Sequence, residues 1–428
     1  MYVRRVTINH VRSISHLEWS VEPGKERGWH VIIGDNGAGK SSFLRSIALA
    51  LVGDKDAEAL RQDWDTWLSR GVANGSVELG LMAEPEWDAT VRTPEQGGHV
   101  DADVGVRFVR TRGGVMLEGT APIAGWALRS STGWFSAAYG PFRRFSGGTE
   151  SERIFSSRPR LAAHLSVFGE DIALTECIRW LQDLQLQKLE NPSADEAHLI
   201  DGVVDFVNQP GFLPHHAQIH EISSKGVRFR DGNGYDIRVE DLSDGYRSVL
   251  SMAFELLRQL SLAFPPDRVF SSDEPGRVQA PGVVLIDEID AHLHPTWQKR
   301  IGKWLREHFP NIQFIVTTHS PLICQAASEG SVWRLPRPGT NEVGGRVEGT
   351  DLERLVYGNV LDAYGTDLFG EDVSRSEESK QLLQRLAILN RKERRGTLTG
   401  EEREEQHHLR SILPTAADTL KTAEDLAA

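Results

Sequence analysis

A glycine-rich stretch near the N-terminus decides the fold class. It reads Trp29-His30-Val31-Ile32-Ile33-Gly34-Asp35-Asn36-Gly37-Ala38-Gly39-Lys40-Ser41. The apolar run from Trp29 to Ile33 is typical of a buried strand, and the pattern from Ser41 to about Val52 predicts a helix. Glycines between a strand and a helix let the backbone curl so that its N–H groups point at phosphate oxygens. The spacing therefore predicts a phosphate-binding P-loop.

The P-loop motif gives each of its residues an expected role. Lys40 is expected to pair with the β- and γ-phosphates of ATP, and the Ser41 hydroxyl to contact Mg²⁺. The candidate nucleotide-binding residues follow one another without a gap and are Gly34, Asp35, Asn36, Gly37, Ala38, Gly39, Lys40, Ser41 and Ser42.

Two apolar runs in the last third of the chain end in polar residues. Val283 to Ile286 precedes Asp287 and Glu288, and Ile312 to Val316 precedes Thr317-Thr318-His319. Such runs are typical of central parallel strands, whose carboxyl ends carry the ligand site of open sheets. We expect Asp287 to hold Mg²⁺, Glu288 to orient or deprotonate the attacking water, and His319 to reach the γ-phosphate.

A serine and a glycine open the helix that we expect from about Ser243 to Ala263. The exposed N–H groups of a helix N-terminus, together with the Ser243 hydroxyl and Gly245, form a second candidate anion site. An ordinary helix N-cap is the alternative interpretation of the same residues.

The order of these four segments resembles that of ABC-type ATPases. It is closest to the branch of P-loop AAA-family proteins that includes SMC heads, RecF-type repair proteins and OLD-family nucleases. The resemblance covers about residues 1–55 and 240–325 and rests on Asn36 to Ser42, Leu242 to Gly245, Asp287 to Pro295 and Thr318 to Pro321. It implies that Ser243 and Gly245 close over the nucleotide of another subunit, with Asp290 at the contact between the sites.

Three positions depart from this family pattern. Asp244 and Tyr246 replace the second glycine-like position and the glutamine of the signature. The metal-contacting glutamine loop of the family is not identifiable either. Ala138 to Arg144 occupies a suitable place but contains no glutamine.

The composition indicates a globular protein. The chain has 428 residues, of which 39% are hydrophobic, and its formal net charge is −13. This balance argues against a surface that coats DNA, although a local basic groove stays possible. Cys177 and Cys324 match no metal or redox spacing, and no secretory signal or membrane span is visible. We therefore expect a cytoplasmic protein.

We expect an α/β fold, with a P-loop ABC-type ATPase core that is split by a strand-and-helix insertion and followed by a C-terminal helical tail. The N-terminal half of the core is assigned to 1–55 and the C-terminal half to 241–345. A β-rich lobe and helical insertion occupies 56–240, and the tail occupies 346–428. No heptads are sustained over the insertion, so a full SMC-type coiled-coil arm is not expected. The tail helices are candidates for partner docking or oligomerisation.

Three further features have a functional and a structural interpretation. Aromatic residues alternate with arginines from Trp126 to Phe145; we favour a packed lid over the nucleotide above a surface for single-stranded nucleic acid. Val347 to Asp351 resembles the acidic entry of a Toprim nuclease domain, but Thr350 and Glu353 are better explained as a helix capping box. The cluster His215, His216 and His220 lacks a Cys or acidic partner, and surface histidines are the simpler interpretation.

These features predict an ATP-binding and hydrolysing switch that uses Mg²⁺ and forms an ATP-dependent homodimer or higher homo-oligomer. The pattern from Asp287 to Pro295 resembles ATPases of prokaryotic anti-phage defence modules of the Septu and retron type, in which a separate effector such as a nuclease acts. One alternative is a RecF-like repair ATPase that binds DNA directly. A transporter's ATP-binding subunit is another alternative, which the N-terminal strands and His292 to Pro295 disfavour. No membrane partner is expected.

Overall fold

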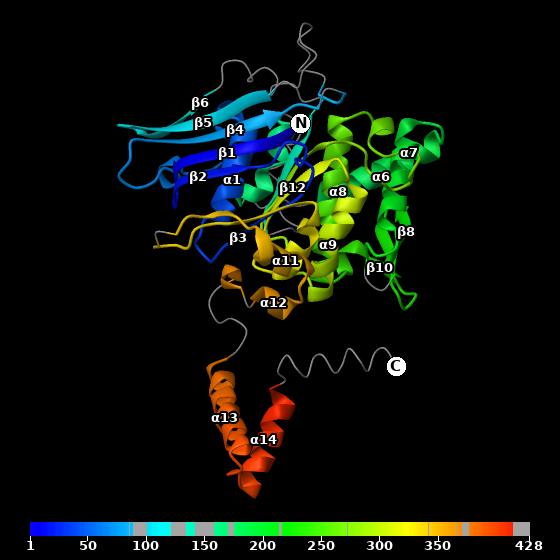
Figure 1. Cartoon of the computed structure of the whole chain (residues 1–428). Coiled ribbons are helices and arrows are strands. Elements are labelled where there is room, and N and C mark those ends of the chain that lie inside the picture. Colours follow the sequence, from blue (N-terminus) through cyan, green and yellow to red (C-terminus); the bar gives the residue numbers. More distant parts are fainter. Residues whose placement is uncertain are drawn as a thin grey trace. The chain divides into compact units, whose positions relative to one another are not determined.

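The computed structural model describes residues 1–84, 86–88, 101–120, 134–141, 158–169, 175–213, 216–271, 273–340, 342–364, 366–369 and 376–413. The chain divides into two compact units, Met1–Ala363 and Tyr364–Ala428. Figure 1 shows the elements of both units.

A six-stranded sheet in the larger unit carries the candidate site. Its strand order is β14-β13-β3-β12-β11-β7. The strands are β3 (Gly28–Ile33), β7 (Ser136–Tyr139), β11 (Gly282–Ile286), β12 (Ile312–Thr317), β13 (Gly330–Arg334) and β14 (Gly345–Arg346). All adjacent pairs are parallel except β13 with β14. Every residue of β7, β11 and β12 is buried, as the apolar runs in β11 and β12 predict for central parallel strands. We call the edge where the parallel strands end the carboxyl edge, and the opposite edge the amino edge.

A five-stranded antiparallel sheet covers the P-loop helix from its other side. Its order is β2-β1-β4-β5-β6. The strands are β1 (Tyr2–Val11), β2 (Ile14–Ser20), β4 (Asn74–Met82), β5 (Asp101–Thr111) and β6 (Gly114–Gly119). Helix α1 (Lys40–Val52) contacts strands of both sheets, and almost all its residues are buried. One hydrophobic core that includes Phe43, Ile47 and Trp67 therefore joins the two sheets.

Helices and a small sheet fill the interval between the two halves of the core. They are α2 (Asp54–Ala57), α5 (Pro159–Ala162), α6 (Thr175–Glu190), α7 (Asp195–Val207), β8 (Gln218–Ser223), β9 (Gly226–Arg230) and β10 (Asp236–Arg238). Asn191 to Ala194 separate α6 from α7, and Asp231 to Tyr235 form the turn between β9 and β10. Strands β4 to β7 come from the same interval, and β4 and β7 pair with β1 and β11, which lie outside it.

The C-terminal half of the core returns to the six-stranded sheet. It contains α8 (Asp244–Ala263), α9 (Pro295–His308), α10 (Pro321–Cys324) and the 3₁₀ helix η6 (Gln325–Ser328). Helices α11 (Gly349–Tyr357) and α12 (Val360–Tyr364) follow. The capping box predicted at Thr350 is wrong, because α11 begins at Gly349 with Glu348 as its N-cap and makes no side-chain cap hydrogen bond. Thr350 therefore lies inside the first turn.

The smaller unit is a helical hairpin. Helices α13 (Glu377–Arg394) and α14 (Gly400–Ile412) pack through Leu386, Leu389, Leu409 and Leu413. Thr399 and Glu402 form a capping box at the start of α14. The C-terminal helices of the expected fold class are thus confirmed.

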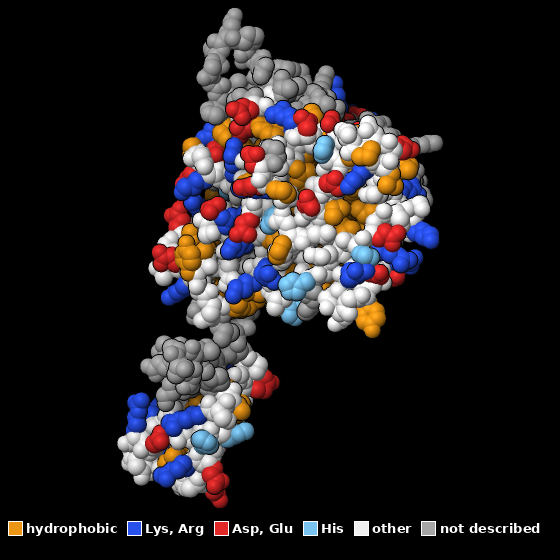
Figure 2. Space-filling model, turned by 90° about the vertical axis from the view of Figure 1, so that its right-hand side faces the viewer, with side chains coloured by type: hydrophobic (Ala, Val, Ile, Leu, Met, Phe, Trp, Pro, Cys, Tyr) orange, Lys and Arg blue, Asp and Glu red, His pale blue; other side chains and the backbone are white. Residues whose placement is uncertain are grey.

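Charged groups of both signs share one face of the protein. On the face that Figure 2 shows, acidic and basic side chains are interspersed, with small hydrophobic patches between them. Among the described helices, none is long and apolar enough to cross a membrane.

Candidate functional site

The P-loop leaves the carboxyl edge between β3 and α1. Gly37 and Gly39 have φ angles of 82° and 99°, in the left-handed region that favours glycine. A Cβ atom on Gly39 would lie 3.2 Å from Ile14 Cγ1 and 3.3 Å from Ser13 Oγ, so a side chain there would be crowded by the start of β2 and the turn before it. The loop therefore has the backbone that a phosphate cradle requires, and α1 begins directly after it.

Lys40 lies at the centre of the site. Its Nζ donates hydrogen bonds to the carbonyl oxygens of Gly34 at 2.7 Å and Asp35 at 3.0 Å. Burial lowers the pKa of Lys40, and the nearby carboxylates of Glu288 and Asp287 oppose that shift. The structure thus brings together the P-loop lysine and the acidic pair, which are far apart in the sequence.

A loop after β13 covers the outer side of the P-loop. Leu335 donates its N–H to the Ile33 carbonyl, and a Cβ atom on Gly37 would lie 3.8 Å from Pro338 Cγ. Arg337 Nε lies 3.7 Å from Asp35 Oδ2. The sequence analysis did not identify Arg337, because no motif signals a contact made by a loop this far along the chain.

The acidic pair ends β11 with a sharp turn. Asp287 is buried, and its Oδ1 accepts a hydrogen bond of 2.6 Å from Thr317 Oγ1. The Glu288 N–H donates to the same Thr317 oxygen at 2.8 Å. Glu288 has a φ of 46°, a left-handed conformation that is uncommon for a residue with a side chain. One threonine thus fixes both acidic residues from the neighbouring strand.

The switch-histidine segment contacts the loop after the acidic pair. Thr318 Oγ1 donates to Asp290 Oδ1 at 2.6 Å, and the His319 N–H donates to the same oxygen at 3.4 Å. Burial lowers the pKa of His319, the positive charge of Lys40 lowers it further, and the carboxylates of Asp290 and Glu288 oppose this. The ring is therefore neutral at pH 7. Thr317 and Thr318 were missed as site residues, although two hydroxyl side chains at the end of an apolar strand were a usable signal.

The signature segment lies beside the loop that follows the acidic pair. Ser243 is the N-cap of α8, is exposed, and makes no side-chain cap hydrogen bond. A Cβ atom on Gly245 would lie 3.2 Å from the His292 carbonyl oxygen. His292 has a φ of 65°. The Ser243 hydroxyl therefore does not serve as the ordinary N-cap of the alternative interpretation.

These residues fit ATP and Mg²⁺. The P-loop backbone and Lys40 offer donors and a positive charge to phosphates. Within the described residues, no group of three or more His, Cys, Asp or Glu side chains could hold a metal ion by itself. Asp287 and the Ser41 hydroxyl would hold Mg²⁺ together with phosphate oxygens, since Mg²⁺ usually binds one or two carboxylates, water and phosphates. The ion supplies charge neutralisation on the phosphates when bound.

The remaining candidates of the sequence analysis have separate outcomes. Trp134, Phe135 and Tyr139 of the aromatic stretch are buried, and the Tyr139 carbonyl accepts the Asp287 N–H at 2.8 Å. Gly140 and Pro141 follow β7 beside the acidic pair without a glutamine. The other residues of the stretch lie outside the described residues; they are Trp126, Arg129, Phe142, Arg143, Arg144 and Phe145.

The histidine cluster shows no metal geometry among the residues that the structure describes. His220 Nε2 lies 2.7 Å from Arg230 Nη2 and 3.8 Å from Asp236 Oδ2. His215 lies outside the described residues. The polar neighbours of His220 are thus the surface groups of β9 and β10.

Two family models match the chain in the halves that carry the site. A model described as "AAA domain" matches residues 5–114, and one described as "AAA domain, putative AbiEii toxin, Type IV TA system" matches residues 178–325. The first range contains the P-loop, and the second contains the signature, the acidic pair and His319. Both matches are thus to AAA-type domains, the class of P-loop protein that the motifs predict.

Curated relatives are similar over part of their length. Septu protein PtuA of Bacillus mycoides (strain KBAB4) is 27% identical over 335 residues, which is 77% of this chain and 40% of the relative. The retron Ec83 probable ATPase of Escherichia coli is 34% identical over 166 residues, which is 36% of this chain and 29% of the relative. The chain thus spans less than half the length of these relatives.

Among solved structures, an SMC head bound to the C-winged helix domain of ScpA is similar in fold. It is 18% identical with a TM-score of 0.47, and the match covers 81% of this chain and 97% of that chain.

Proposed function

We propose that the protein binds and hydrolyses ATP as a switch that dimerises around the nucleotide and controls a separate effector in prokaryotic anti-phage defence. The observation that carries the ATPase part is the convergence of Lys40, Glu288 and His319 at one edge of the sheet. The carboxylates of the acidic pair raise the pKa of Lys40 against the effect of burial, and the charge of Lys40 lowers the pKa of His319. The similarity to Septu PtuA and to retron ATPases supports the defence role.

Each residue has a separate task in the proposed reaction. Lys40 and the P-loop N–H groups hold the β- and γ-phosphates, and the neutral His319 ring contacts the γ-phosphate. Glu288 orients the attacking water and accepts its proton at the carboxylate. Thr317 positions Asp287 and Glu288 without touching the substrate.

The ATPase part is tested by phosphate release and by the binding of a fluorescent ATP analogue. Lys40→Ala is expected to abolish both, because the variant loses the charge that pairs with the phosphates. Lys55→Ala is the matched control, since Lys55 is an exposed lysine on α2 after the P-loop helix. Unchanged turnover in Lys40→Ala would contradict the proposal.

The dimer part rests on Ser243, whose exposed hydroxyl leaves the helix cap open. Glu288→Gln should retain ATP and trap the dimer, which light scattering during sizing chromatography detects. Adding Ser243→Arg to that variant should return it to the smaller species, whereas Ser224→Arg on the exposed β8–β9 turn should not. If Ser243→Arg leaves the ATP-trapped species intact, the signature does not act across a dimer.

The defence role predicts an effector rather than DNA as the direct partner. Phage plating with and without the neighbouring reading frames tests it, using Lys40→Ala as the inactive control. ATP-dependent, salt-sensitive DNA binding by the isolated protein would instead favour the RecF-like alternative.

A further inference from the structure

The P-loop carries an acid of its own. Asp35 directly follows Gly34, the first glycine of the loop. Its carboxylate acts on Lys40, because Asp35 is among the groups that oppose the lowering of the Lys40 pKa by burial. A negative charge near the lysine that is proposed to hold the phosphates opposes the binding of an anion such as ATP. A positive charge next to Asp35 would offset this effect.

The other carboxylates that act on Lys40 have tasks in the proposed reaction, and Asp35 has none. They are Asp287, Glu288 and Asp290. Asp287 is proposed to hold Mg²⁺ and Glu288 to orient the attacking water, while Asp290 accepts hydrogen bonds from the switch-histidine segment. The charge of Asp35 is therefore the one that the site gains most by offsetting.

The loop after β13 brings a cation to this acid. A Cβ atom on the first glycine of the P-loop would lie 3.3 Å from Leu335 Cβ, and one on Gly37 would lie 3.8 Å from Pro338 Cγ. Arg337 directly precedes Pro338, and its Nε lies 3.7 Å from Asp35 Oδ2. The loop thus packs on both ends of the glycine-rich turn and places Arg337 beside the acid between them.

Arg337 is held in place without nucleotide. Thr340 donates to the Arg337 carbonyl from its N–H at 3.3 Å and from its hydroxyl at 2.9 Å. The Arg337 side chain is only 20% exposed, so water screens its charge less than that of a fully exposed residue. Glu342 Oε2 lies 3.9 Å from Arg337 Nε, but it also lies 3.4 Å from Arg334 Nη2. Glu342 is therefore shared between two arginines and does not neutralise Arg337 alone.

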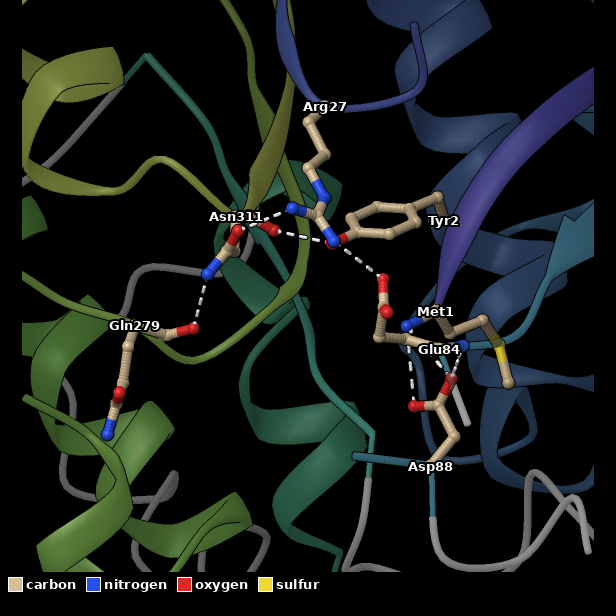
Figure 3. A network of polar contacts seen from close by, with 7 residues as sticks. All are labelled: Met1, Tyr2, Arg27, Glu84, Asp88, Gln279 and Asn311. Carbon is tan, nitrogen blue, oxygen red and sulfur yellow. Dashed lines mark hydrogen bonds and ion pairs between the residues drawn. The ribbon is translucent and has the colours of Figure 1, made fainter. Parts of the chain in front are cut away.

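An arginine at the amino edge shows what a purely structural tie looks like. Arg27 donates from Nη1 to Asn311 Oδ1 at 2.7 Å and from Nη2 to Glu84 Oε2 at 2.9 Å (Figure 3). The Tyr2 hydroxyl joins the same network by donating to the Asn311 carbonyl at 3.0 Å. None of these partners belongs to the P-loop. Arg27 therefore ties distant segments of the fold together, whereas Arg337 pairs with an acid inside the P-loop.

We propose that Arg337 is a positioning residue of the nucleotide site. It holds the Asp35 carboxylate on the outer side of the P-loop and offsets its charge, so that the phosphates of ATP bind to a loop that contains an acid. Arg337 acts through Asp35 and does not itself touch the nucleotide. The inference rests on the proposed function, since it takes ATP as the ligand, and it adds a residue that lies outside every motif of the sequence.

A double-mutant cycle tests this relation on the full chain, with the fluorescent ATP analogue and Mg²⁺. Arg337→Met should weaken the binding about ten-fold, because the charge of Asp35 is then uncompensated. Asp35→Asn alone should not weaken it. Asp35→Asn combined with Arg337→Met should restore the affinity to within about three-fold of the wild type, since the acid that Arg337 offsets is gone.

Two further readouts separate this electrostatic role from packing of the loop. The loss in Arg337→Met should shrink as salt is added, and Arg337→Lys, which keeps the charge, should retain most of the affinity. In steady-state hydrolysis, KM should rise in Arg337→Met while kcat changes less than about two-fold, because the change affects binding rather than the chemical step.

Arg27→Met is the matched control, because it makes the same change in charge and shape at the amino edge. It should lower the midpoint of thermal unfolding and leave the affinity for the analogue within about two-fold. Thermal unfolding of each variant verifies that it is folded. Arg337→Gln replaces Arg337→Met if the latter is not.

Three results would overturn the inference. They are equal affinity of the wild type and Arg337→Met, a double variant that binds as weakly as Arg337→Met, and an equal loss in Arg27→Met. Failure of the proposed function looks different, because then the wild type does not bind the analogue or Lys40→Ala binds it equally well. If the wild type binds and Lys40→Ala does not, a failed cycle overturns the role of Arg337 alone.

Discussion

The two edges of the six-stranded sheet differ in how their functional groups are arranged along the chain. At the carboxyl edge, each functional group comes shortly after a buried strand. Lys40 follows the P-loop after β3, and His319 follows β12. At the amino edge, a pocket of about 890 Å³ takes its cations from three separated segments, which contribute Lys25, Arg277 and Lys303 among others. Functional residues at strand ends follow an apolar run and so form a recognisable sequence motif. Residues that are brought together from loops and a helix end form no such motif.

The two edges also differ in electrostatic environment. Lys40 and Asp287 are buried at the carboxyl edge, where a lost partner leaves a desolvated charge. Lys303 and Glu329 at the amino edge are largely exposed, and their ion pairs are screened by water. Substitutions should therefore have large effects at the first edge and graded effects at the second.

Among the substitutions that leave ATP binding intact, the largest effect is expected for Glu288→Gln. The variant keeps the shape of the side chain but loses the proton acceptor, so ATP turnover should fall by about 10²–10³-fold while ATP binding persists. Phosphate release and the binding of a fluorescent ATP analogue measure the two quantities. Equal loss of binding and turnover would place Glu288 in nucleotide binding instead.

The free energy of unfolding should depend on pH through two histidines buried at the six-stranded sheet. Burial lowers the pKa of His30 on β3 and of His164, whose Nε2 lies 3.2 Å from Ser136 Oγ of β7, to about 4 each. Above about pH 6.5, the ordinary pKa of histidine, burying the two neutral rings costs the folded state no proton, so their full contribution to stability is present. Between pH 6.5 and 4 the unfolded chain binds more protons, so stability falls as pH falls, by about 3 kcal/mol for each histidine.

Urea unfolding between pH 7 and 4 measures this loss. His164→Gln should remove about half of the pH dependence, because His30 still titrates on unfolding. A pH dependence that is the same in the variant would mean that other groups cause it.

A smaller effect is expected for Thr317→Val, which tests whether Thr317 positions the acidic pair at the carboxyl edge. The change removes the hydroxyl that joins Asp287 to the Glu288 backbone, so turnover should fall about ten-fold. Thr317→Ser keeps the hydroxyl and should restore most of the rate. If serine does not rescue, packing of the Thr317 methyl group, rather than the hydrogen bonds, sets the activity.

The smallest effect on turnover is expected at the amino edge. Lys303→Glu should leave the basal ATPase rate within about two-fold, since the exposed Lys303 lies at the opposite edge from the P-loop. Phosphate release measures this rate. A large loss would show that the two edges are coupled.

The parts of the fold that could be predicted follow from local patterns. The apolar runs before Gly34, Asp287 and Thr317 predicted β3, β11 and β12 closely, because buried parallel strands need continuous apolar residues. The capping box at Thr350 was wrong because Gly349 begins α11 one residue earlier.

Contacts between distant segments could not be predicted. The pairing of Arg337 with Asp35 and the hydrogen bonds of Thr317 depend on which strands are neighbours. That order is set by tertiary packing and has no local signal. The same reason hid the pocket at the amino edge.

The Thr317 hydroxyl fixes the direction of the two hydrogen bonds that it makes. A hydroxyl carries a single proton, and here it is given to Asp287 Oδ1 while the oxygen accepts the Glu288 N–H. The chain of bonds therefore runs one way, from the Glu288 backbone to the Asp287 carboxylate. A side chain that cannot donate and accept at the same time would leave either the Asp287 carboxylate or the Glu288 N–H without this partner. The orientation of the carboxylate and the conformation of the next residue are thus set by one oxygen atom.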